Sequence, residues 1–90
     1  MKQGKLQLGN EAVPVEYELR SSLSGLKRTI AGRLILGQAP GAELSAALVK
    51  LTGANLVTDD GHVLFVEFTN ALNGEEVEFL AAPPTGFIVN

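Results

Sequence analysis

The sequence predicts an α+β domain: a mainly antiparallel sheet or half-open barrel in the order βββ-α-βββ, with one short helix near residues 40–52. Apolar and polar residues alternate with a period of two in several segments, which is typical of strands with one buried face. Leucines recur at helical spacing in one stretch, and glycine-containing pairs that favour turns separate the alternating segments. Because a chain of 90 residues suits one domain, we expect a single domain over residues 1–90.

The first hairpin is the clearest part of the sheet. Residues 5–8 alternate polar with apolar. Gly9-Asn10 suits a two-residue turn whose first position, here a glycine, has a positive φ. The returning strand, residues 13–20, places four apolar side chains on one face: Val13, Val15, Tyr17 and Leu19. Pro14 has no N–H to donate, so we expect this strand at a sheet edge, at least around that residue.

A break and a third strand follow. Residues 21–25 are rich in serine and glycine, and they predict an end to the second strand. Residues 29–36 are partly apolar on both faces, so we expect a central strand there. Gly32 inside this strand indicates a bulge or a close approach of another backbone.

Residues 40–52 have the features of an amphipathic helix. Pro40 suits the first helical position, because its missing N–H would have no partner there. Glu43 and Lys50 lie at the ends where the helix dipole favours their charges. Gly53 is expected to end the helix. Such a short helix is marginal alone, so its apolar stripe should pack on the sheet; the stripe is Leu44, Leu48 and Leu51.

The last third predicts three more strands, over residues 55–58, 62–69 and 75–81, with a strong hairpin signal at Asp60-Gly61. After Pro83-Pro84, the chain ends in an apolar segment formed by Phe87, Ile88 and Val89. Terminal residues fray unless something holds them, so we expect this segment to be covered by the core or by a second protomer. The small core favours the second protomer, and a twofold dimer is the commonest closed assembly.

Charge is unevenly distributed along the chain, whose net charge is −3. All seven Lys and Arg residues lie in residues 1–50, whereas residues 51–90 contain six acidic residues and no Lys or Arg. This asymmetry fits either a surface with opposite faces or ion pairs between neighbouring strands, and we favour the ion pairs.

Several classes of protein are excluded or disfavoured. The chain has no cysteine, so it has neither disulfides nor a thiolate metal site. No stretch approaches the roughly 20 apolar residues of a membrane span, and no apolar run typical of a signal peptide follows the first residues. We therefore expect a cytoplasmic protein with no membrane association.

His62 is the only histidine, and it follows Asp59, Asp60 and Gly61. The spacing does not fit an EF-hand, and a zinc site would need further ligands from distant carboxylates. We interpret this group as a turn. A hydrolytic or metal role around His62 is the third hypothesis. Serines at positions 21, 22 and 24 lack the Gly-x-Ser-x-Gly pattern of a nucleophile, and the glycines form no phosphate-binding loop.

Lys27, Arg28 and Arg33 form the one basic cluster, a candidate site for phosphate or a nucleic-acid backbone. An overall pI near 5.0 and the absence of aromatic residues among these cations make nucleic acid an unfavoured partner.

No constellation typical of an enzyme is present, and no cofactor or metal is expected. The leading hypothesis is therefore a small non-catalytic protein–protein interaction or assembly domain, self-associating as a homodimer through an edge strand or through Phe87, Ile88 and Val89. The alternative is binding of a phosphate or nucleic-acid backbone through Lys27, Arg28 and Arg33.

Overall fold

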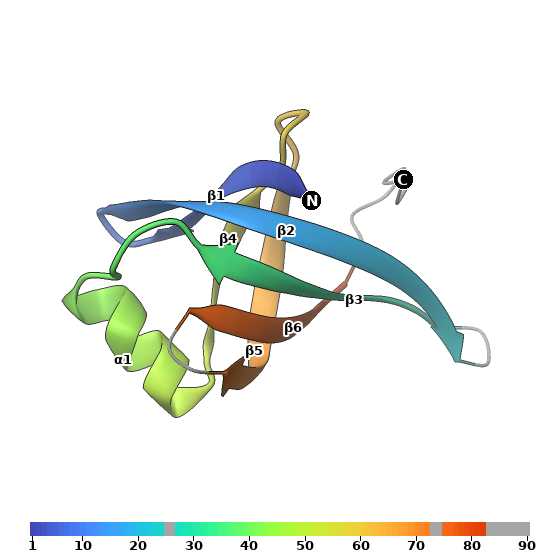
Figure 1. The fold of residues 1–90 in the computed structure, drawn as a ribbon. Coiled ribbons are helices and arrows are strands. Elements are labelled where there is room, and N and C mark those ends of the chain that lie inside the picture. The colour runs from blue at the N-terminus through green and yellow to red at the C-terminus, as the bar shows by residue number, and fades with distance from the viewer. Residues whose placement is uncertain (25–26, 73–74, 83–90) are drawn as a thin grey trace.

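The computed structural model describes residues 1–24, 27–72 and 75–82, with the backbone alone at residues 22–24, 27 and 72. In these residues six antiparallel strands and one short helix are present (Figure 1). In chain order they are β1 (Lys2–Leu8), β2 (Glu11–Ser24), β3 (Lys27–Leu36), α1 (Ala42–Lys50), β4 (Gly53–Val57), β5 (Val63–Leu72) and β6 (Glu76–Ala81).

The strands form a closed barrel in the order β1-β2-β3-β6-β5-β4. Consecutive strands pair as hairpins within β1–β3 and within β4–β6, and the pairing of β3 with β6 joins these two halves of the chain. The barrel closes where residues 5–7 of β1 pair with residues 55–57 of β4. The predicted fold class is thus confirmed, and the sheet closes completely.

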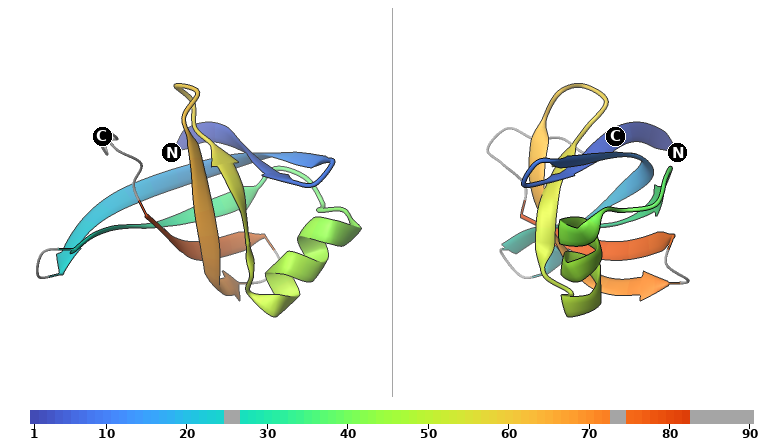
Figure 2. Two further views of the ribbon diagram at one scale, coloured as in Figure 1. Left: turned by 180° about the vertical axis from the view of Figure 1, so that it is seen from behind. Right: turned by 90° about the vertical axis from the view of Figure 1, so that its left-hand side faces the viewer.

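β2 and β3 extend beyond the barrel. Their ladder runs without a shift from the pair Val15–Leu36 to the pair Ser24–Lys27. β1 accompanies β2 only as far as Tyr17, and β6 accompanies β3 only from Ile30. We call residues 19–24 and 27–32 the arm, although its residues 30–32 still pair with β6. The arm and α1 lie at opposite ends of the molecule, whose longest dimension is 37 Å (Figures 1 and 2).

The break expected at residues 21–25 is wrong for residues 21–24, which continue β2. Ser21, Ser22 and Ser24 favour turns locally, but β3 offers each of them a ladder partner, and tertiary pairing overrides a weak local preference. For the same reason β5 extends to Leu72, beyond the residue 69 predicted from the sequence.

Pro14 does not mark an edge strand, because β2 lies between β1 and β3. The ladder with β3 begins only at Val15, and the Gly37 N–H donates to the Pro14 carbonyl at 2.8 Å on that side. The missing N–H of Pro14 thus falls on the side of β3, just past the end of the ladder, where a proline removes no ladder hydrogen bond.

The helix begins and ends differently from the prediction. Pro40 precedes the N-cap residue, Gly41, which has no side chain to cap the helix. Glu11 of β2 caps it instead: the Glu43 N–H donates to Glu11 Oε1 at 2.7 Å. At the other end Leu51, with φ of 53°, takes the left-handed C-cap position expected of Gly53, which begins β4. Leu51 therefore leaves the apolar stripe.

The core lies inside the barrel and under α1. Leu44, Ala47 and Leu48 of the helix pack on it. Gly32 allows the predicted close approach, because a Cβ there would lie 2.5 Å from the Glu18 carbonyl oxygen and 2.7 Å from the Phe79 ring. No helix in the described ranges is long and apolar enough to cross a membrane.

Leu44→Ala should lower the free energy of unfolding by about 2–5 kcal/mol, because it opens a cavity at a fully buried position. Leu51→Ala is the matched control, since Leu51 is 46% exposed and its truncation should cost far less. Urea unfolding of both variants measures the difference. Equal losses would show that α1 does not dock through Leu44.

Candidate functional site

The turn between β4 and β5 contains His62 and both aspartates. The His62 N–H donates to Thr58 Oγ1 at 3.0 Å, and the Thr58 hydroxyl donates to the Asp60 carboxylate. His62 Nδ1 lies 3.0 Å from Asp60 Oδ1. The hydrogen bond from Thr58, followed by that from His62, lowers the pKa of Asp60 to about 2. The side chains of this turn thus stabilise one another.

Asp59 is not part of the hydrogen-bonded group formed by Thr58, Asp60 and His62. It bonds instead to Tyr17 of β2 and so connects the turn to the barrel. The Tyr17 hydroxyl donates to Asp59 Oδ1 at 3.0 Å and accepts from the Asp59 N–H at 3.0 Å. Tyr17 is buried, and burial raises its pKa above the ordinary 10.0. Among the described residues, no group of three or more His, Cys, Asp or Glu side chains is arranged to hold a metal ion.

The three predicted basic residues do not form one site. Lys27 and Arg28 begin β3, where Arg28 Nε donates to Ser21 Oγ at 3.1 Å. Arg33 lies over the barrel wall between two carboxylates: its Nε is 2.6 Å from Glu18 Oε1, and its Nη1 is 3.1 Å from Glu76 Oε1. The hydrogen bond with Glu18 is the main cause of a raised pKa of Arg33.

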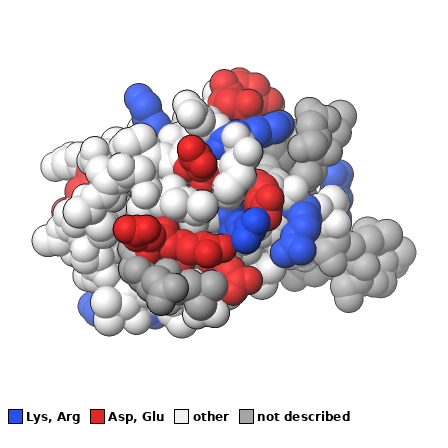
Figure 3. Space-filling view, viewed as in Figure 1, with Lys and Arg blue, Asp and Glu red and all other residues white. Residues whose placement is uncertain are grey.

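The ion pair between Arg33 and Glu76 joins the basic first half of the chain to the acidic second half, as the cross-strand interpretation expects. In Figure 3, basic and acidic side chains lie next to one another across the middle of the face shown there. The arm does not show this mixture of basic and acidic side chains. Residues 19–32 contain three cations, Arg20, Lys27 and Arg28, and no acidic residue.

Arg20 was missed as a member of the basic group because a break was expected after it. Once β2 continues through Ser24, the register places Arg20 opposite Ala31 on the arm. Arg20 and Arg28 are both exposed. The absence of any acidic residue over residues 19–32 was the available signal in the sequence.

An exposed apolar strip lies on the outer wall of the barrel. It consists of Val63 and Phe65 of β5 and Leu80 of β6, whose exposed fractions are 55%, 58% and 45%. Next to it, a groove of about 350 Å³ reaches the arm; Phe65 and Leu80 line it together with Arg28, Thr29, Glu67, Ala81 and Ala82. The strip was also missed, although residues 63–66 are apolar on both faces of the strand, which was a visible signal.

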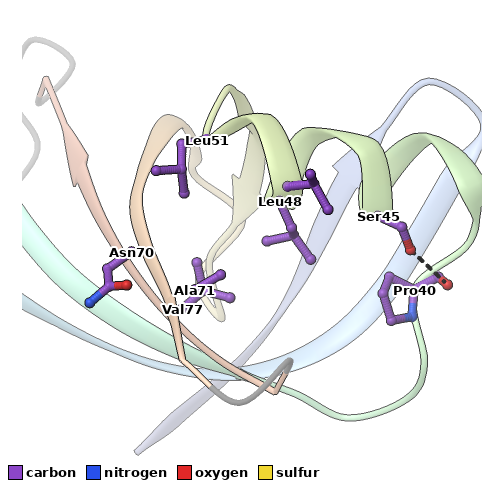
Figure 4. A pocket seen from close by; sticks show the side chains of 8 residues that line it. Pro40, Ser45, Leu48, Leu51, Asn70, Ala71 and Val77 are labelled. Carbon is purple, nitrogen blue, oxygen red and sulfur yellow. Dashed lines mark hydrogen bonds between the residues drawn. The ribbon is translucent and has the colours of Figure 1, made fainter.

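A larger groove, of about 520 Å³, lies between α1 and the ends of β5 and β6 (Figure 4). Its two side-chain amide and hydroxyl groups already have partners. Ser45 Oγ donates to the Pro40 carbonyl at 3.4 Å, and Asn70 Nδ2 donates to Glu78 Oε1 at 3.3 Å. The groove therefore offers no convergent set of polar groups for chemistry.

The chain matches no protein-family model, and no curated protein or solved structure is significantly similar to it.

Phe87, Ile88 and Val89, the predicted self-association segment, lie outside the described residues. What the described surface offers is an apolar strip, a groove and a basic arm, all of which suit binding.

Tyr17→Phe should lower the free energy of unfolding by about 1–3 kcal/mol at neutral pH, because it removes two part-buried hydrogen bonds with Asp59, one of them to a carboxylate. The stability of the variant should also fall less at alkaline pH than that of the wild type. Since the folded state raises the pKa of Tyr17, wild-type stability falls as the pH rises past 10.0, where the unfolded chain ionises first.

Urea unfolding of both proteins at pH 7 and above pH 10 measures this. The difference between them should shrink as the pH rises. A constant difference would mean that the Tyr17 hydroxyl is not held neutral in the folded protein.

Proposed function

We propose that this chain is a small non-catalytic protein-interaction or assembly domain that forms a homodimer. The observation that carries the proposal is the apolar strip of Val63, Phe65 and Leu80. Isolated exposed apolar residues are common, but neighbouring large ones on a barrel wall are typical of binding surfaces. Phe65 is an aromatic side chain, the kind that most often anchors a protein interface.

A structural role explains only part of the exposure of Phe65. Its ring lies over Gly53 of β4, where a Cβ would come within 2.6 Å of the ring. It therefore covers a glycine in the neighbouring strand, yet more than half of it stays exposed. A twofold axis near the strip would bury the exposed part against its own copy.

The strip would form the centre of such an interface and not the whole of it, since stable interfaces bury about 800 Å² on each partner. The groove beside the strip includes Ala81 and Ala82, and only four residues, 83–86, separate Ala82 from Phe87 in the sequence. We include Phe87, Ile88 and Val89 in the proposed interface for this reason.

Phe65→Ser should convert the dimer into a folded monomer. Sedimentation velocity over a series of concentrations measures the mass, and thermal unfolding checks the fold. Val49→Ser, which changes a more exposed apolar residue of α1 outside the strip and its groove, is the matched control and should remain a dimer. Deletion of residues 86–90 should weaken the dimer. A wild type that is monomeric at every concentration would overturn the proposal.

A second candidate is binding of a phosphate or nucleic-acid backbone. One observation favours it: Arg28 and the exposed aromatic Phe65 line the same groove, although they are far apart in the sequence. Two facts oppose it. Arg33 is engaged by Glu18 and Glu76, and the net charge of −3 repels a polyanion.

Gel-shift titration with single-stranded and duplex DNA at several salt concentrations separates the two candidates. An interaction domain should give no salt-sensitive shift. Binding that weakens by close to one log unit per log unit of salt for each contacted phosphate, and that Arg28→Ala abolishes, would favour the second candidate.

A further inference from the structure

Among the described residues, one edge of the arm has no ladder partner. β1 pairs with β2 from Glu11 to Tyr17 and goes no further. From Glu18 to Ser24, the described part of the chain gives β2 a ladder partner on one side only, which is β3. In a barrel that is otherwise closed, this stretch presents a row of backbone N–H and C=O groups to a partner.

The register identifies which residues point outward from this edge. In a strand, the N–H and C=O of one residue point to the same side, and successive residues alternate. The Pro14 carbonyl points toward β3, because it accepts from the Gly37 N–H, and the Glu18 carbonyl lies beside Gly32 of β3. The ladder has no shift, so the odd-numbered residues Leu19, Ser21 and Leu23 direct their backbone groups to the free side.

Charge selects the occupant of this edge. The arm contains Arg20, Lys27 and Arg28 with no acidic residue, and Arg20 is exposed on the edge strand itself. A second copy pairing through the same edge would bring six cations together. DNA has phosphate acceptors for the N–H groups but offers no donors along its backbone for the outward C=O groups, and RNA offers only its 2′-hydroxyls.

We propose that the free edge of β2 accepts an extended, acidic segment of another protein as an added antiparallel strand. Backbone hydrogen bonds to Leu19, Ser21 and Leu23 hold the segment, and its Asp or Glu side chains meet the exposed Arg20 or Arg28. At Leu19 and Ser21 the added strand extends a sheet that already includes β3 and β6. Beyond Ile30 it adds a third strand to a two-stranded ribbon, which is marginal by itself. This inference rests on the interaction role proposed above but uses a different surface from the apolar strip.

NMR titration of the full-length, ¹⁵N-labelled chain tests it. The probe is a short synthetic peptide in which glutamate alternates with valine. Binding should slow hydrogen exchange at Leu19, Ser21 and Leu23 and leave the amides between them unchanged, since those already bond to β3. The same peptide with lysine in place of glutamate, and an oligothymidylate of similar length, should bind far more weakly.

Two variants make the test specific. Ser21→Pro removes an outward N–H without removing a hydrogen bond to β3, so affinity for the glutamate peptide should fall roughly tenfold. Ser21→Ala is the matched control: it loses the hydrogen bond from Arg28 but keeps the N–H, and it should bind as the wild type does. Arg20→Glu should weaken binding without changing the backbone, and it decides the matter if Ser21→Pro does not fold.

The proposal is overturned if the peptide does not bind, if Ser21→Pro and Arg20→Glu bind it as the wild type does, or if the lysine peptide or the oligothymidylate binds more tightly. Dimerisation that Ser21→Pro abolishes would also overturn it in favour of a second copy. Because Phe65→Ser should not affect the titration, a failure of the proposed dimer and a failure of the strand-addition site are separate results.

Discussion

The hydrogen bonds between Tyr17 and Asp59 hold the barrel closed. β1 and β4 pair over only three residues each, which is a short ladder for the strands that complete a cylinder. Tyr17 belongs to β2, on the other side of β1, and its ring passes over Gly4 to reach the turn after β4. A Cβ on Gly4 would overlap the Val57 carbonyl oxygen and lie 2.9 Å from the Tyr17 ring, so this approach requires glycine. One buried side chain thus links three strands.

This closure accounts for polar residues that would otherwise suggest chemistry. Asp59 is engaged by Tyr17, whereas Thr58, Asp60 and His62 form the turn that presents Asp59. The helix is held in a similar way, since a carboxylate of the first hairpin, Glu11, supplies the cap that Gly41 lacks. Residues far apart in sequence are therefore used to fix the order of the strands and the position of α1.

Local patterns in the sequence correctly predicted the features that depend only on residues nearby in the chain, such as the buried face of a strand and a tight turn. The alternation at Val13, Val15 and Tyr17 placed all three in the core, and Gly9, with φ of 59°, makes the predicted turn. Features that depend on contacts between distant segments could not be predicted from such patterns. Serines at 21–24 favour a turn until β3 pairs with them, and Leu51 matches the helical stripe until the helix ends one residue earlier. The basic site changed for the same reason: the register, which no local pattern specifies, gives Arg33 two carboxylates and places Arg20 on the arm.

A closed barrel removes most of the strand edges through which small β domains associate, and this restricts where a partner can bind. In the described residues, the outer wall formed by β5 and β6 offers side chains to a partner, chiefly Phe65, because its backbone groups are engaged in ladders. The arm offers the opposite: few large apolar side chains, but backbone groups on the free side of Leu19, Ser21 and Leu23. An apolar wall is suited to its own copy, since a twofold axis matches like with like. A basic edge repels its own copy and is suited to an acidic strand. If both proposals hold, the two surfaces differ in the partner that each binds as well as in their position.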